Sequence, residues 1–237
     1  MPANQFSFGQ GDEHVGEKSK PFKGEANRSY RISFAWWKGL DEGKLDFDSN
    51  APIFAGANAN FIPGCGYVIN KGAEYTKVAG GEAPRQRIAT VIIVWPTDKK
   101  GELDKSRLSE AEVKVWVISG DKFQTLKGIN AEFPFAKHDF KATCSDAQYQ
   151  KMTFTPCKDS VLAMLSNNEK AQPLIAKWIE KAQELAGAIN DHIGREMTIQ
   201  QIRDKLAGGG NGAGPIAPVD SSSATDLDAA VENYLDV

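Results

Sequence analysis

The chain has 237 residues, of which 41% are hydrophobic and 25% are charged, as in an ordinary globular protein. This length is enough to bury a core, and no apolar run reaches the roughly 18 residues of a membrane span. The net charge is −3, but five acidic residues follow Lys205, which is the last basic residue. Without those five negative charges the net charge of the chain becomes +2, so a mildly basic body carries an acidic tail.

The N-terminal part of the chain combines a polar arm with one clear strand pattern. Residues 1–27 are rich in Gly and Lys, lack the hydrophobic stretch of a secretory signal, and are expected to become ordered only by contact with something else. Residues 29–37 alternate aromatic or aliphatic side chains with small or polar ones, which is typical of a half-buried strand. Residues 38–64 contain several Gly and Pro and are expected to form loops.

Three further segments predict the centre of a sheet. Residues 66–72 are expected to form a strand that enters a turn. Residues 87–95 are apolar on both faces, which is typical of a central strand, and Pro96 ends the pattern. After a charged connection, residues 113–119 predict another strand.

A short helix and a hairpin complete the β-rich part. The helix is expected to begin at Gly120 and to end at Gly128, with apolar residues at helical spacing between them. Residues 139–144 and 150–155 are joined by a polar turn and should pair as a hairpin. We therefore expect an α+β fold with a β-rich core over residues 28–158.

From residue 159 the hydrophobic period becomes helical. Residues 173–193 have one broad apolar face, and Thr198 is a plausible N-cap for a last helix. This helical segment, 159–207, is expected to be a cap on the core or an oligomerisation element, since its apolar face must be covered. Residues 208–237 combine a Gly-rich linker with the acidic tail and are expected to be disordered.

Cysteine spacing and known motifs argue against metal sites and enzymes. Cys65, Cys144 and Cys157 are widely spaced and odd in number, which does not fit a disulfide framework or a zinc knuckle. No Walker loop, nucleophile elbow or zinc-protease motif is present in the sequence. We expect a cytoplasmic protein that is not an enzyme and has no metal or other cofactor.

Aromatic and basic residues are mixed through residues 28–127. Single-stranded nucleic acids are bound by cations that follow the phosphates and by flat side chains on which bases stack. The alternative is that the aromatic residues form the core and the basic residues an ordinary solvated surface. The candidate nucleic-acid-binding residues are Arg28, Tyr30, Arg31, Trp36, Trp37, Lys38, Tyr67, Lys71, Tyr75, Lys77, Arg85, Arg87, Lys99, Lys100, Lys114, Trp116, Lys122 and Lys127.

The C-terminal tail interleaves acids with apolar residues. Such a peptide cannot fold alone, but it can place apolar side chains in a partner's groove with its carboxylates near basic residues. It could equally occupy the protein's own cationic cleft until DNA displaces it, or serve only as a solubilising terminus. The candidate partner-binding residues are Asp226, Leu227, Asp228, Val231, Glu232, Tyr234, Leu235 and Asp236.

The order of features from Arg87 to Thr155 resembles the core of the helix-destabilising proteins of T-even phages. The order begins with a hydrophobic strand, a charged connection and a strand rich in Val and aromatic residues. A short helix then opens with Gly120-Asp121-Lys122-Phe123, and a further strand is formed by Asp139-Phe140-Lys141-Ala142-Thr143-Cys144. The resemblance implies an OB-like or variant antiparallel β-barrel, single-stranded DNA binding, and a place in the host cytoplasm. This sequence differs from that family at the zinc-binding loop, because it has only Cys65 in the corresponding region and no cluster of His and Cys ligands.

The resemblance also bears on partners. In single-strand binding proteins of lytic phages and bacteria, an acidic tail recruits replication or recombination proteins, and some lytic-phage members bring an RNA polymerase to single-stranded template. We therefore expect a sequence-tolerant single-stranded DNA-binding protein of phage replication or recombination. It could also recruit a polymerase in transcription and form homo-oligomers. The alternatives are a protein–protein adaptor or transcription cofactor that acts through its tail, and a virion or assembly component.

Overall fold

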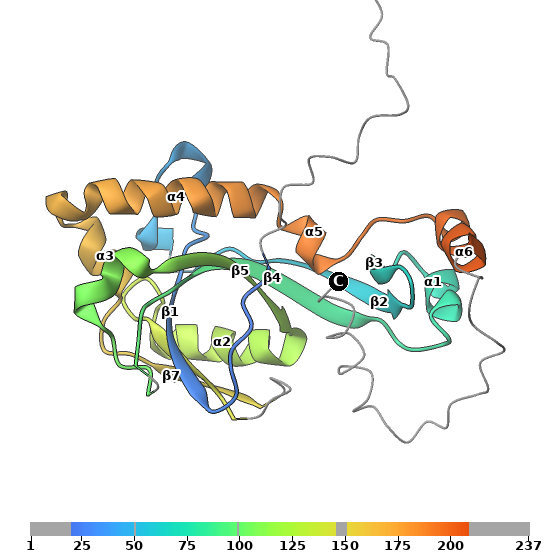
Figure 1. The fold of residues 1–237 in the computed structure, drawn as a ribbon, viewed down its shortest axis with the longest axis horizontal. Helices are drawn as coiled ribbons and strands as arrows, with labels where there is room; N and C mark the ends of the chain where they lie inside the picture. The colour runs from blue at the N-terminus through green and yellow to red at the C-terminus, as the bar shows by residue number, and fades with distance from the viewer. Residues whose placement is uncertain (1–19, 50, 99, 146–150, 209–237) are drawn as a thin grey trace, which may run out of the picture.

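The computed structural model describes residues 20–49, 51–98, 100–145 and 151–208. Here a seven-stranded antiparallel sheet lies between helices (Figure 1), which confirms the predicted α+β class. The strands are β1 (Arg28–Phe34), β2 (Ala55–Ile62), β3 (Gly66–Ile69), β4 (Arg85–Val94), β5 (Glu112–Ser119), β6 (Phe140–Cys144) and β7 (Met152–Pro156). The α-helices are α1 (Ala73–Val78), α2 (Gly120–Glu132), α3 (Val161–Ser166), α4 (Gln172–Gly187), α5 (Asn190–Ile193) and α6 (Ile199–Gly208).

The sheet is organised around β4. Residues 88–94 of this strand are all buried, as the apolar run predicts. β5 pairs with one edge of β4 over residues 87–94. The other edge is shared, because β2 pairs with residues 85–89 and β1 with residues 92–94. The sheet therefore forks into a β2–β3 branch and a β1–β6–β7 branch.

Four strands of this sheet form a Greek key. β1, β4 and β5 lie side by side, and β6 returns to pair with the free edge of β1, giving the spatial order β6-β1-β4-β5. β7 pairs with β6 in the predicted hairpin, and α2 connects β5 to β6. In the described part of the chain no strand ladder joins β5 to β7, so the sheet is not closed into a barrel.

The main core lies on the α2 side of these strands. The rings of Trp116 on β5 and Phe140 on β6 are stacked, with centroids 5.9 Å apart. Leu126 of α2 belongs to the same cluster, and so does Phe22, which precedes β1 in the chain. The aromatic side chains that define the cluster thus come from β1, β5, β6 and β7, and their burial holds the open sheet in its curved shape.

Residues 20–27 belong to the body and not to a free arm. Phe22 is buried, with its ring centroid 5.1 Å from that of Tyr30. Its backbone N–H donates to the Val115 carbonyl, and the Asn27 N–H donates to the Cys144 carbonyl, so the segment crosses from β5 to β6. Gly24 has no space for a side chain here, because a Cβ would lie 2.3 Å from Cys144 Sγ. The rest of the expected arm, residues 1–19, lies outside the described residues.

The helix α4 covers the opposite face of β4 and β5 (Figure 1). Its apolar side, with Ile175, Trp178, Ala182 and Leu185, packs on the second core cluster, where the Trp178 and Trp95 rings meet edge to face at 5.2 Å. The broad apolar face that the sequence shows is therefore covered by the protein's own sheet.

The β2–β3 branch forms a smaller lobe with α1 and α6. Ile62, Val68 and Ile202 are fully buried in its own cluster, and the Tyr75 hydroxyl donates to the Met197 carbonyl at 2.9 Å. Thr198 caps α6 as predicted, since its Oγ1 accepts from the Gln201 N–H. β2 itself lies in a stretch predicted to be loop. Its Ala, Gly and Asn residues have low strand propensity, and pairing with β3 and β4 overrides that preference.

A buried carboxylate joins the sheet to the helical segment. Asp139, which is 0% exposed, precedes β6 and accepts hydrogen bonds from Arg31 Nε at 2.9 Å, from the Val161 N–H at 3.0 Å and from Ser33 Oγ. Ser33 Oγ in turn accepts from Trp95 Nε1 at 2.7 Å. Burial raises the pKa of the Asp139 carboxyl, and these hydrogen bonds act in the opposite direction.

Replacing Trp178 by Ala should lower the free energy of unfolding by about 3–5 kcal/mol, because it removes a buried ring and leaves a cavity between α4 and the sheet. Lys177→Ala, at the exposed neighbouring position, should leave it unchanged. Chemical denaturation followed by circular dichroism measures both. An equal effect of the two substitutions would contradict the packing of α4 on β4 and β5.

Asp139→Asn should also destabilise the fold, by about 3–5 kcal/mol, since it leaves Arg31 without its buried partner. Glu110→Gln removes a carboxylate from an exposed pair with Arg107 and should have no measurable effect. Urea unfolding curves of the two variants test this difference, and a stable Asp139→Asn protein would show that the network does not hold the helical segment.

Candidate nucleic-acid interface

Four of the predicted aromatic residues are core residues. Tyr30, Trp37, Tyr75 and Trp116 are each less than 10% exposed. Trp37 lies beyond the end of β1, and its Nε1 donates to the Phe34 carbonyl at 2.8 Å. These rings are therefore buried against the protein and present no free face to a base. Trp36, which precedes Trp37, is half-buried.

Two of the predicted arginines hold parts of the fold together. Arg31 binds Asp139, and its Nη2 also donates to the Asp159 carbonyl at 2.8 Å. The Arg87 guanidinium lies 3.6 Å from the centroid of the Tyr67 ring and donates to the carbonyls of Ile193 and His192 at the end of α5. Burial lowers the pKa of Arg87, while Tyr67 acts in the opposite direction.

The remaining predicted cations are dispersed. Two of them are tied to acids, Lys71 to Glu196 and Lys114 to Glu112. Lys99 and the whole predicted tail lie outside the described residues. The exposed cations, which lie on α1, on α2, at the start of β4 and in loops, are Lys38, Lys71, Lys77, Arg85, Lys100 and Lys127; Lys114 and Lys122 are half-buried.

One end of the main core does bring predicted residues together. The rings of Tyr30 on β1 and Trp116 on β5 both contact the Phe22 ring. The Arg28 guanidinium carbon is 5.0 Å from the centroid of the Tyr30 ring, and Nη1 donates to Glu25 Oε2 at 2.8 Å. Its Nε is buried and has no hydrogen-bond partner in the described residues.

The segment that carries Phe22 adds cations to this end. Lys20 and Lys23 are both exposed, and Lys114 is adjacent to Val115, whose carbonyl binds the Phe22 N–H. We call Lys20, Lys23, Arg28 and Lys114 the cationic end. Sequence reasoning missed the two lysines because it assigned them to a free arm. The available signal was Phe22 itself, a large apolar residue in an otherwise polar segment, because such a side chain is more often buried than exposed.

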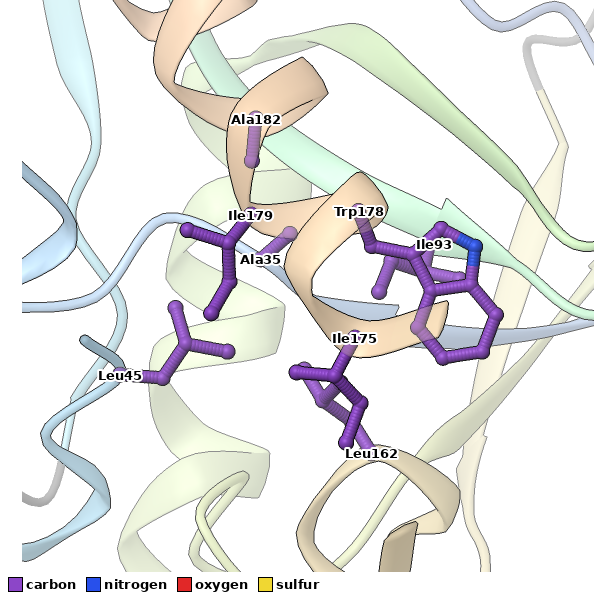
Figure 2. Close-up of a pocket in the computed structure, with 8 residues that line it drawn as sticks. All are labelled: Ala35, Leu45, Ile93, Leu162, Ile175, Trp178, Ile179 and Ala182. Carbon is purple, nitrogen blue, oxygen red and sulfur yellow. The ribbon is translucent and has the colours of Figure 1, made fainter. Parts of the chain in front are cut away.

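A crevice under α4 is the other candidate site. It is lined only by apolar side chains, among them Leu45, Leu162, Ile175 and Ile179 (Figure 2). Figure 2 shows the α4 side chains directed toward the sheet and α3. The crevice does not admit a water molecule and contains no polar group to orient a ligand, so we interpret it as imperfect packing.

The comparisons with known proteins give no assignment. No protein-family model, curated protein or solved structure matches this chain. In residues 20–208, apart from the short gaps, no cluster of three His, Cys, Asp or Glu side chains is arranged to hold a metal ion. None of the described helices is long and apolar enough to cross a bilayer.

Arg87→Met should lower the free energy of unfolding by about 2–3 kcal/mol, because the variant loses charged hydrogen bonds to two carbonyls. Lys77→Met, at an exposed position on α1, serves as the control and should unfold like the wild type. Thermal and urea denaturation measure this. If the two variants were equally stable, Arg87 would not be the residue that fastens α5 to the sheet.

Proposed function

We propose that this protein binds single-stranded DNA with little sequence preference. The observation that carries the proposal is the Greek-key order β6-β1-β4-β5, with β7 beside β6 and α2 between β5 and β6. Five-stranded, partly open Greek-key barrels of the OB type bind oligonucleotides. We accordingly describe the core as a variant of that fold, in which residues 20–24 lie at the edge of β5.

The cationic end supports the same proposal. Two of its four cations are paired with acids, Arg28 with Glu25 and Lys114 with Glu112, and the other two, Lys20 and Lys23, are exposed. Cations of this kind neutralise phosphates and release counterions on binding. The proposed role belongs to phage replication or recombination, with the acidic tail recruiting a replication, recombination or transcription protein.

The experiment is a salt titration of binding to a fluorescently labelled dT oligonucleotide, followed by anisotropy. Intrinsic fluorescence is a poor probe here because Trp37, Trp95, Trp116 and Trp178 are buried. We expect affinity to fall steeply between about 50 and 200 mM salt, and a duplex of equal length to bind more weakly. The double substitution Lys23→Gln/Arg28→Gln should reduce the log–log salt slope by about 1.4, or about 0.7 for each lost phosphate contact.

Lys77→Gln/Lys127→Gln is the matched control, because both residues are exposed cations on other elements. It should change the slope less than the substitutions at the cationic end. Binding that does not depend on salt, or that favours the duplex, would rule out the proposal. If the protein binds no nucleic acid and deletion of residues 217–237 abolishes capture of a partner protein, the adaptor function is the correct one.

A further inference from the structure

The outer face of β4 and β5 is not available to a ligand. In OB-type barrels, the second and third strands present the face on which oligonucleotides lie. The corresponding strands here are β4 and β5, and their outer residues Val91, Ile93 and Val115 are buried under α4. Farther along β4, Arg87 is engaged with α5. A single strand bound to this protein must therefore follow another surface.

Within the described part of the chain, the outer face of the β1–β6–β7 branch has no such cover along β7, where Thr153 and Thr155 are exposed. The strand register arranges six outward side chains in two rows, Ser29–Thr143–Thr153 and Arg31–Lys141–Thr155. The alternate residues of the same strands, such as Ile32, Phe140 and Ala142, point into the core. We call these six residues the hydroxyl face; Thr153 and Thr155 are exposed and the other four are half-buried.

The hydroxyl face has the chemistry of a phosphate-binding surface. It carries four hydroxyl groups and two cations, and none of its six residues is acidic. Ser, Thr, Lys and Arg side chains are among the groups that contact phosphate oxygens in protein–DNA complexes.

The two cations of this face have different counter-charges. Arg31 is fixed by the buried Asp139. Lys141 instead pairs at 2.5 Å with Glu102, whose side chain is 71% exposed and which belongs to the loop that passes over Ser29. Solvent screens this pair from its exposed Glu102 side, so a phosphate can replace the Glu102 carboxylate on Lys141.

We propose that single-stranded DNA runs along the hydroxyl face, with a phosphate taking the place of Glu102 on Lys141. This inference rests on the proposed function and specifies its binding surface. In this arrangement the Glu102 carboxylate competes with the DNA phosphate for Lys141, so removing the charge of Glu102 should strengthen DNA binding. A purely structural role of the Lys141–Glu102 pair does not predict such an increase.

The test measures binding of a labelled dT oligonucleotide to the full-length protein and three variants. Lys141→Gln should weaken binding and reduce the log–log salt slope by about 0.7. Glu102→Gln should tighten binding about two- to fivefold, the range that corresponds to weak exposed ion pairs. Thr153→Val/Thr155→Val keeps the strand-forming shape and should weaken binding with the salt slope unchanged.

The lobe offers a matched pair of controls. Lys71 and Glu196 form an exposed ion pair at 2.8 Å, so Lys71→Gln and Glu196→Gln make the same charge changes away from the hydroxyl face. They should shift affinity less than the corresponding changes at Lys141 and Glu102. Circular dichroism of each variant confirms that it is folded.

The outcomes separate this inference from the proposed function. If the wild type binds the oligonucleotide but Lys141→Gln and Glu102→Gln behave like Lys71→Gln and Glu196→Gln, the hydroxyl face is not the path and the binding function stands. If the wild type binds no single strand under any salt condition, the proposed function fails, and the inference fails with it.

Discussion

The Asp139 carboxylate is the group on which the arrangement of sheet and helices depends. It lies between β1, the end of β4 and the start of α3, and it accepts hydrogen bonds from Arg31, Ser33 and Val161. A buried ion of this kind is costly unless its hydrogen bonds are complete, and one of its three donors is the Val161 N–H at the start of α3. The cap formed by α3 and α4 is therefore positioned by a polar contact, although apolar packing supplies most of its stabilisation.

The burial of β4 on both faces has a direct consequence for function. A strand that is apolar on both sides requires a layer on each, and the chain supplies α2 on one side and α4 on the other. In the proposed correspondence with OB-type barrels, the second layer occupies the face that such barrels use for ligands. The proposed DNA path therefore follows the β1–β6–β7 branch, where the outward residues of the described strands are polar and cationic.

The sequence predicts those features that depend on local periodicity. The apolar run of β4, the β6–β7 hairpin, the amphipathic pattern of α4 and the cap at Thr198 all follow from neighbouring residues. It does not predict β2, whose strand state depends on two partners distant in the chain. It also could not decide which aromatic rings are core: Tyr30 and Trp116 have the composition of a stacking platform, and only the packing of Phe22 between them shows that they are buried.

The same limit explains why the candidate surface differs from the predicted set. The charge of Arg31 predicts a phosphate contact, but its partner Asp139 is 108 positions away, and no local pattern reveals that pairing. Lys141, Thr153 and Thr155 stand out only when the register aligns them with β1. Since Asp139 fixes Arg31 at the edge of the hydroxyl face, the carboxylate that docks the helical cap also positions a cation on the outer side of the sheet. Stability of the cap and geometry of the surface are thus coupled through one buried group.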